Sequence, residues 1–213
     1  MNEQPSLNEL KQTQKKNVKT ALFIMSGILV FAVAGLLLLN HFLTKEDDTS
    51  EKYIHFYPVD DRNIFENPDY LSLNRSVLFC DDPSGWYGQT TEITAEERMG
   101  FDATVRFADD YLNALIYGSE SALRAMCSSN YLSAHEISDF TQQMIYEAKI
   151  IYHSTEGREG GGKLVTYRLD YKIYKNNGTY RRDVGSDTVK SEYLVLGVSS
   201  DESEICIEDI LRP

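Results

Sequence analysis

The sequence contains few of the residues that build metal centres and disulfide frameworks. It has three cysteines and four histidines in 213 residues, and it contains no Cys-x-x-Cys pair and no Cys/His cluster. A structural zinc site needs four such ligands at short spacings, so we expect no zinc and no other bound cofactor. Cys80, Cys127 and Cys206 allow either one disulfide with a free thiol or three unpaired thiols, and their spacing does not choose between these alternatives.

Signatures of catalysis are also missing. The sequence contains no Gly-x-Ser-x-Gly, His-Glu-x-x-His or Ser-x-x-Lys motif, which excludes the hydrolases that these motifs identify. The stretch from Gly157 to Lys163 matches the first part of a phosphate-binding loop, but Leu164 stands where a Ser or Thr would bind magnesium. This stretch also precedes an expected strand, whereas a phosphate is held by the amides of a following helix. We therefore interpret it as a hairpin loop.

Positive charge is scarce compared with negative charge. The chain has 21 Lys and Arg against 33 Asp and Glu, and only two of the acids, Glu3 and Glu9, precede residue 45. A domain with this excess of acid binds phosphate backbones poorly, so we expect no nucleic-acid partner. The acidity keeps such a domain soluble, and it favours partners with basic surfaces.

The most conspicuous feature of the chain is a run without charge from Thr20 to Thr44. A helix rises ~1.5 Å per residue, so the run is about 37 Å long and can cross a ~30 Å hydrocarbon core. A cleaved signal peptide has a shorter apolar region that ends at its cleavage site, whereas Ala32-Val33-Ala34 is followed by further leucines. We predict a membrane anchor, and because the run lacks charged residues we expect no ion pathway in it.

The lysines that flank this run indicate its orientation, because Lys and Arg are retained on the cytoplasmic side. Two lysines follow the run closely, Lys45 and Lys52, and four precede it: Lys11, Lys15, Lys16 and Lys19. We predict a single-pass protein of the cell membrane, with a cytoplasmic N-terminus and an extracytoplasmic C-terminal domain. The expected divisions are a tail at 1–19, the span at 20–44, an acidic linker or stalk at 45–93 and a folded domain at 94–213.

Within the linker, residues 76–80 predict a short strand, and the apolar patch 53–57 is expected to dock on the domain. The segment from Asp81 to Tyr87 resembles a calcium loop superficially, but it lacks the full twelve-residue loop and the closing Glu. We therefore expect no metal there.

Three helices are predicted at the beginning of the outer domain. Thr94 and Glu97 form a capping box before an apolar pattern of helical period, which predicts a helix over 95–117 that ends at Gly118. A short helix is expected over 120–127. A third begins at a second capping box, Ser133 to Glu136, and carries Ile137, Phe140 and Met144. Asp109 and Asp110 are adjacent acids on the first helix, and we place them on its solvent side.

After the helices the apolar period changes from about 3.6 to two residues. The segment 163–175 alternates, with Val165, Tyr167, Leu169, Tyr171 and Ile173 on one face, which predicts a long antiparallel strand with one buried face. Asn176-Asn177-Gly178 predicts a hairpin turn that returns through residues 179–184. The other strands are expected at 148–153, 193–198 and 204–211.

This order of elements resembles the nuclear-transport-factor-like superfamily, which includes ketosteroid isomerases and polyketide cyclases. The likeness lies in the segments 107–115, 118–123, 165–173 and 205–210. The resemblance implies an α+β fold, with a cone-like domain of about three helices packed on a curved antiparallel sheet. Combined with one N-terminal span, the layout is similar to bitopic scaffold subunits of conjugation and type IV secretion systems, which act through protein contacts.

We therefore predict a membrane-anchored extracytoplasmic interaction module, a scaffold without catalytic activity in a cell-envelope assembly. Its expected partners are the lipid bilayer, through residues 20–44, and other envelope proteins with basic surfaces. The alternative is a small-ligand binding protein or an enzyme that uses the interior of the cone, with Tyr111, Tyr167 and Tyr171 as the candidate ligand pocket. The predicted inward strand face offers no carboxylate, which speaks against an isomerase.

Overall fold

The computed structural model describes residues 53–213, apart from residues 61, 84–88 and 160. The predicted tail and the predicted membrane span, 1–19 and 20–44, lie outside the described residues. Among the helices that are described, none has the length and apolar character needed to cross a bilayer. One compact unit extends from Ile54 to Pro213.

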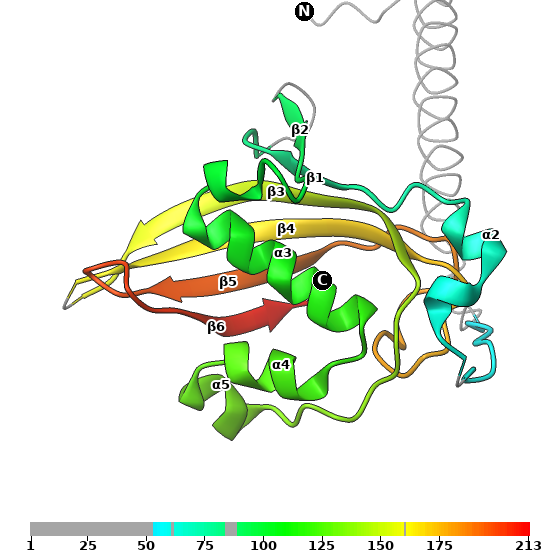
Figure 1. The fold of residues 1–213 in the computed structure, drawn as a ribbon. Coiled ribbons are helices and arrows are strands. Elements are labelled where there is room, and N and C mark those ends of the chain that lie inside the picture. The colour runs from blue at the N-terminus through cyan, green and yellow to red at the C-terminus, as the bar shows by residue number, and fades with distance from the viewer. Residues whose placement is uncertain (1–52, 61, 84–88, 160) are drawn as a thin grey trace, which may run out of the picture. The chain divides into compact units, whose positions relative to one another are not determined.

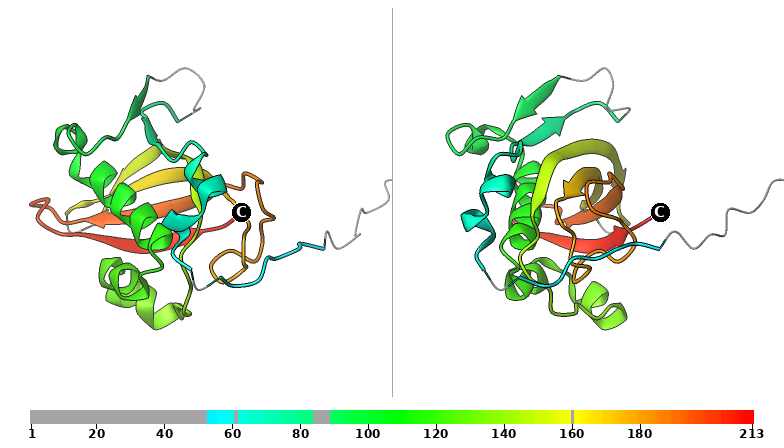
Figure 2. Two further views of the ribbon diagram at one scale, coloured as in Figure 1. Left: turned by 45° about the vertical axis from the view of Figure 1, so that its right-hand side comes forward. Right: turned by 90° about the vertical axis from the view of Figure 1, so that its right-hand side faces the viewer.

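This unit is an α+β domain in which the helices α3, α4 and α5 lie over one side of a curved sheet (Figures 1 and 2). In chain order, the elements are the 3-10 turn η1 (Ile64–Glu66), α2 (Pro68–Leu71), β1 (Val77–Cys80), β2 (Thr90–Glu92), the 3-10 turn η2 (Arg98–Gly100), α3 (Ala103–Ile116), α4 (Glu120–Met126), α5 (Ser129–Ala134), β3 (Ile145–Gly157), β4 (Lys163–Ile173), β5 (Glu192–Val198) and β6 (Ile205–Leu211).

The sheet is mixed, whereas the sequence predicted an antiparallel one. Its strand order is β2-β1-β3-β4-β5-β6, and β3 to β6 form the expected antiparallel neighbours. The difference lies in β1, which runs parallel to β3 and pairs Val77 with Ala148. Parallel neighbours need a long crossover, and here the crossover contains α3, α4 and α5. The sequence pattern showed the strands but not the direction of this pair.

The segment predicted as a linker, 45–93, belongs to the compact unit from Ile54 onward. In addition to its two strands, it contributes Tyr70, which is 1% exposed and whose hydroxyl donates to the Ile145 carbonyl at 2.9 Å. The 53–57 patch contacts the domain as expected, since the Tyr57 N–H donates to the Asn176 carbonyl at 2.9 Å. The predicted boundary at residue 94 is therefore too late. The segment has the composition of a linker because only a few apolar residues anchor it in the core.

The main helix, α3, begins later than the predicted span of 95–117. The expected cap at Thr94 is present in part, because its hydroxyl accepts from the Glu97 N–H at 3.2 Å, but it is followed by η2 and not by α3. Phe101 then has an extended backbone, and Asp102 caps α3 by accepting from the N–H two residues later at 2.8 Å. A second, stronger cap therefore sets the beginning of the helix.

The end of α3 agrees with the prediction. Gly118 has a φ of +63°, and a Cβ at this position would lie 2.6 Å from the backbone nitrogen of Gln142. Both the left-handed backbone and the close approach of another segment therefore require glycine here.

The predicted solvent position of Asp109 is wrong. Asp109 is only 6% exposed, and Arg98 Nε donates to its Oδ2 at 3.0 Å. Burial raises the pKa of Asp109, and Arg98 offsets part of this effect. The adjacent Asp110 also pairs with Arg98, but its side chain is 58% exposed. Arg98 thus covers the acid pair from outside the helix, which the helical period alone does not reveal.

The predicted third helix, beginning at residue 133, is also wrong. Its place is taken by the earlier and shorter α5, whose cap Ser128 accepts from the Tyr131 N–H at 3.1 Å. The apolar residues assigned to one helical face have different neighbours. Phe140 packs against the Tyr180 ring with centroids 5.3 Å apart, whereas Met144 packs near α2, in the cluster around Tyr70. Residues 135–144 therefore form an irregular segment between the helices and β3.

The hairpin of β3 and β4 forms the centre of the sheet. Its glycine-rich connection lies between two strands, as predicted, and Gly162 has a φ of +83°. The predicted inner face of β4 is confirmed, because its five members are at most 4% exposed: Val165, Tyr167, Leu169, Tyr171 and Ile173. Together with the inner face of α3 they form the hydrophobic core.

The return strand predicted over 179–184 does not form. Asn176 is fully buried, and its Nδ2 donates to the carbonyls of Arg181 at 3.0 Å and Val184 at 2.8 Å. These bonds hold the connection between β4 and β5 as a compact loop. That loop carries Arg181, which pairs with the buried Glu192.

Candidate functional site

Glu192, the first residue of β5, is a fully buried carboxylate. Its Oε1 accepts from the hydroxyls of Tyr111 and Tyr171, each at 2.9 Å. Its Oε2 accepts from Arg181 Nη1 and from Arg212 Nε, each at 3.2 Å. We call these five residues the Glu192 cluster. Four donors satisfy both carboxylate oxygens, as a buried charge requires.

The charges of the cluster are balanced by residues of the β4–β5 loop. The Arg181 side chain has no exposed surface, and it also pairs with Asp183, Nε to Oδ1, at 2.7 Å. Although burial lowers it, the pKa of Arg181 lies above its ordinary value, because Asp183 and Glu192 stabilise the charged form. Asp183 is further paired with Lys190 at 3.0 Å. The site is thus an ionic network in which no single carboxylate carries an uncompensated charge.

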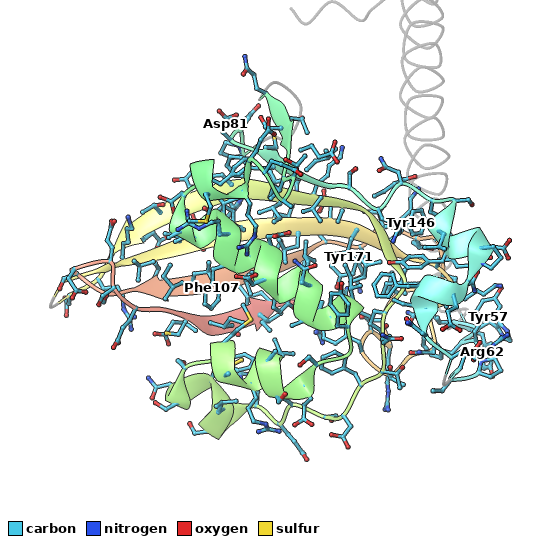
Figure 3. All side chains as sticks on the ribbon, viewed as in Figure 1. Tyr57, Arg62, Asp81, Phe107, Tyr146 and Tyr171 are labelled. Atoms are coloured by element: carbon cyan, nitrogen blue, oxygen red, sulfur yellow. The ribbon has the colours of Figure 1, made fainter. Side chains whose placement is uncertain are left out.

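The tyrosines of the cluster act as hydrogen-bond donors. Tyr111 comes from the inner side of α3, and Tyr171, labelled near the centre of Figure 3, comes from the inner face of β4. Burial raises the pKa of both hydroxyls well above the ordinary value, and the charge of Glu192 raises it further. They therefore stay protonated at neutral pH. The hydroxyl of Tyr111 also pairs with that of Tyr180.

Of the three tyrosines predicted to line one pocket, the structure brings two together. Tyr111 and Tyr171 meet at Glu192, whereas the Tyr167 hydroxyl lies 2.8 Å from Thr104 Oγ1. Burial raises the pKa of Tyr167 to about 12. All three hydroxyls are bonded to protein groups, so they form part of the core.

The sequence interpretation missed the acid at the centre of this site. Glu192 lies one residue before the strand predicted at 193–198, in the same alternation as the buried Leu194 and Leu196. This alternation is a signal from which an inward carboxylate could have been predicted. Arg181 and Arg212 give no comparable signal, because each lies in irregular chain.

A pocket of about 620 Å³ adjoins the cluster. Arg212, a member of the cluster, lines this pocket, as does Tyr180, whose hydroxyl pairs with that of Tyr111. These two residues therefore connect the buried carboxylate to the surface. The remaining wall comes from α4, α5, the irregular segment 135–144, the β4–β5 loop and the end of β6. We call this cavity the Arg212 pocket.

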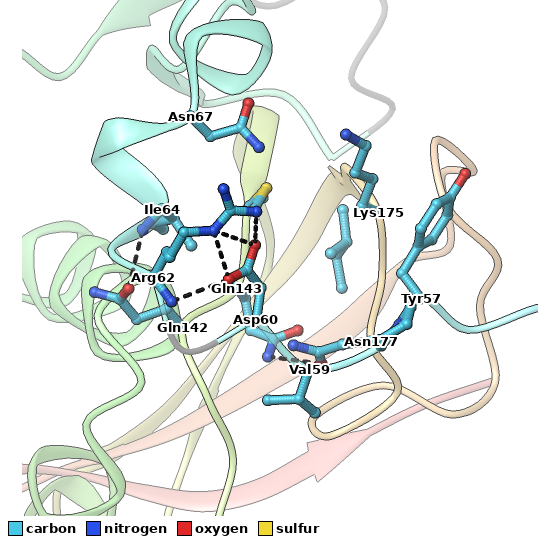
Figure 4. Close-up of a pocket in the computed structure, with 13 residues that line it drawn as sticks. Tyr57, Val59, Asp60, Arg62, Ile64, Asn67, Gln142, Gln143, Lys175 and Asn177 are labelled. Atoms are coloured by element: carbon cyan, nitrogen blue, oxygen red, sulfur yellow. Dashed lines mark hydrogen bonds and ion pairs between the residues drawn. The ribbon is translucent and has the colours of Figure 1, made fainter.

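A second pocket, of about 700 Å³, lies at the end of the domain next to α2 (Figures 3 and 4). The residues that line it include Tyr57, Val59, Asp60, Arg62 and Lys175. Arg62 Nη2 pairs with Asp60 Oδ2 at 2.6 Å, and the Arg62 side chain is 82% exposed. This α2-end pocket is therefore an open surface depression with charged and apolar side chains in its wall, unlike the buried cluster.

Gln143 belongs to the wall of the α2-end pocket and is 1% exposed. Its Nε2 donates to the Thr141 carbonyl at 2.7 Å and to Thr179 Oγ1 at 3.0 Å, which fixes the direction of the amide. Its Oε1 has no hydrogen-bond partner among the described residues. An unsatisfied buried acceptor is costly, so this wall has an unmet hydrogen-bonding requirement.

The three cysteines are unpaired, which corresponds to the second of the two alternatives. Burial raises the pKa of Cys127 to about 11, and the pKa of Cys206 is raised by burial and by the nearby Glu208. These thiols are therefore poor nucleophiles at neutral pH. No group of three or more potential metal ligands occurs in the described part of the chain. The calcium-like segment after Asp81 falls partly outside that part.

The described residues define a class: an α+β domain with helices packed on a six-stranded mixed sheet. No protein-family model, no sequence of a characterised protein and no solved structure matches the chain. Its function is therefore inferred from its own contacts.

Proposed function

We propose that this protein is a membrane-anchored extracytoplasmic interaction module without catalytic activity. The observation that supports this proposal best is the state of Glu192, whose two oxygens are occupied by four donors. A general base needs a free lone pair within reach of a substrate proton, and a nucleophile needs a free oxygen. The buried carboxylate in the interior is engaged in a structural role.

The other buried acid among the described residues has the same character. Asp109, which is 6% exposed, accepts from Arg98 Nε at 3.0 Å. It lies on a different part of the helix from Tyr111, which points to Glu192. The two acids therefore do not form the kind of carboxylate pair that supports acid–base chemistry.

The α2 end of the domain is the surface we assign to a partner. Exposed apolar side chains collect there: Tyr57 is 40% exposed, Val59 48% and Tyr117 59%. Tyr117 belongs to this surface because the centre of its ring lies 5.3 Å from that of Phe65, the second residue of η1. Exposed apolar side chains that lie next to polar and charged ones are typical of protein-contact surfaces. The acidity of the chain favours another envelope protein with a basic surface as the partner.

Site-specific photocrosslinking in intact membranes tests this assignment. A photoreactive residue at Tyr57 or Tyr117 is expected to give one discrete protein adduct. The matched control is Met99, which is 75% exposed and lies before the opposite end of α3. The same adduct pattern from Met99, or no adduct from the α2 end, contradicts the proposal.

Reporter fusions test the predicted topology, which the lysines on either side of 20–44 support. A C-terminal reporter that is active only outside the cytoplasm should be active. If only a cytoplasmic reporter is active there, the anchored extracytoplasmic module is refuted.

The resemblance to scaffold subunits of conjugation and type IV secretion systems stays part of this proposal. A second candidate function, small-ligand binding, is supported by the Arg212 pocket. It would use a cavity at the rim of the domain, and not the tyrosine-lined interior first expected.

A further inference from the structure

The Arg212 side chain is fixed in direction by two contacts. Its Nε donates to Glu192 Oε2 at 3.2 Å, and its guanidinium carbon lies 4.8 Å from the centre of the Tyr180 ring. Glu192 is itself held by three further donors, so it gives Arg212 a rigid support. A guanidinium held at Nε still presents the N–H groups of its two terminal nitrogens.

Glu192 is the carboxylate with which Arg212 forms an ion pair, and no other acidic side chain in the described part of the chain pairs with it. The Arg212 side chain is 36% exposed and lines the Arg212 pocket. Two parallel N–H groups on one guanidinium match the two oxygens of a carboxylate. Arg212 therefore offers half of a bidentate pair on the wall of the pocket.

The charged side chains around the pocket favour a ligand with one negative charge over a ligand with two. Arg182 and Lys190 also line it, as do the acids Glu136 and Asp183. Asp183 is already paired with Arg181 and Lys190. The charged side chains of this wall are thus three cations, with Arg212, and two acids, although the chain as a whole carries a net charge of −12. The two acids would still repel the second charge of a phosphate dianion.

Part of the remaining wall is apolar, next to the polar Ser138 and Thr179. Leu123 and Phe140 are buried, Ile137 and Ile210 are half-buried, and all four line the cavity. A volume of about 620 Å³ lies in the usual range of small-molecule sites. An occupant should therefore combine an apolar body with a charged head.

We propose that the Arg212 pocket binds a monocarboxylate with an apolar body, its carboxylate paired with the terminal nitrogens of Arg212. The carboxylate can belong to a free organic acid or to the C-terminal residue of a peptide. This inference is independent of the interaction surface at α2, because the two share no lining residue.

The test uses the whole chain in detergent micelles and 3-phenylpropanoate as the probe, followed by calorimetry and by protein NMR shifts. The neutral analogue 3-phenylpropanamide has the same body without the charge. A second arm compares a short peptide ending in phenylalanine with its amidated form. Saturable binding of both acids, and at least about tenfold weaker binding of both amides, is expected. Binding of only one acid identifies the source of the carboxylate.

Two substitutions assign the site. Arg212→Lys keeps the charge but removes the two parallel N–H donors of the guanidinium, so it should weaken binding of the acid about tenfold or more. Arg212→Gln should abolish binding. Arg62→Gln, at the exposed pair of the other pocket, is the matched control and should leave binding unchanged.

Three outcomes would overturn the proposal: amide and acid binding equally, Arg212→Lys binding like the unchanged protein, or no saturation by about 10 mM. If Arg212→Gln fails to fold, as judged by circular dichroism, the acid–amide comparison and Arg212→Lys still decide the question.

Discussion

Glu192 is the residue with the largest expected effect on stability. Glu192→Gln keeps the volume but removes the charge that faces two arginines, one of them without any exposed surface. Removing one partner of a buried ion pair typically costs roughly 3–5 kcal/mol. Urea unfolding of the whole chain should show a loss of this order. The exposed Glu66→Gln is the control and should change stability by less than about 0.5 kcal/mol. Equal effects would mean that the Glu192 cluster adds little to the fold.

Because of Asp183, the stability of the fold should depend on pH in the acid range. Although burial raises it, the pKa of Asp183 is held below the ordinary value by Arg181 and Lys190. A carboxyl whose folded-state pKa is depressed adds stability above its unfolded pKa of about 3.9, and this stability is lost as the pH falls through the folded-state value. The unchanged protein should therefore exceed Asp183→Asn in stability at pH 7, and the difference should shrink below about pH 4. A difference that is constant from pH 7 to pH 3 would contradict the assigned ion pairs.

At the scale of elements, α3 allows a direct comparison of its two sides. Leu112 is 1% exposed in the core, so Leu112→Ala should cost roughly 2–5 kcal/mol in urea unfolding. Asp109→Ala should also cost clearly more than a surface substitution, because Arg98 loses its buried partner. Asp110→Ala is the matched control, since Asp110 pairs with the same arginine but is largely exposed. If Asp109→Ala and Asp110→Ala cost the same small amount, Asp109 is solvated after all.

The elements that could be predicted from the sequence were those whose apolar residues all pack against the same core. The inner face of β4 alternates strictly because every second side chain meets the same core, so its positions could be read from period alone. The segment 135–144 failed this condition, because Phe140 and Met144 pack against different neighbours. The Glu192 cluster was predictable only in part. Its two tyrosines lie on periodic elements. Arg181, in contrast, lies in a loop whose path depends on the bonds of Asn176, and Arg212 follows the end of β6.

For the whole molecule, the compact unit that begins at Ile54 leads to a prediction about truncation. A chain that begins at residue 94 lacks β1, β2 and α2, which leaves the edge of β3 unpaired and removes the buried Tyr70. This truncated chain should lose cooperative thermal unfolding, measured by circular dichroism, whereas a chain that begins at residue 54 should keep it. Identical melting curves for the two would show that residues 54–93 are dispensable, as a linker would be.

The parallel pairing of β1 with β3 also has a kinetic consequence. The two strands are neighbours in the sheet but about 70 residues apart in the chain, so β1 is synthesised long before its partner. Closing a contact over this distance costs chain entropy, and it can occur only after the intervening helices and β3 exist. Until then, β1 can pair only with β2, and its other edge, along the apolar residues 77–80, stays open. Docking of this early segment onto the middle of the chain is the expected slow step. A factor that shields it would raise the folding yield without changing the final structure.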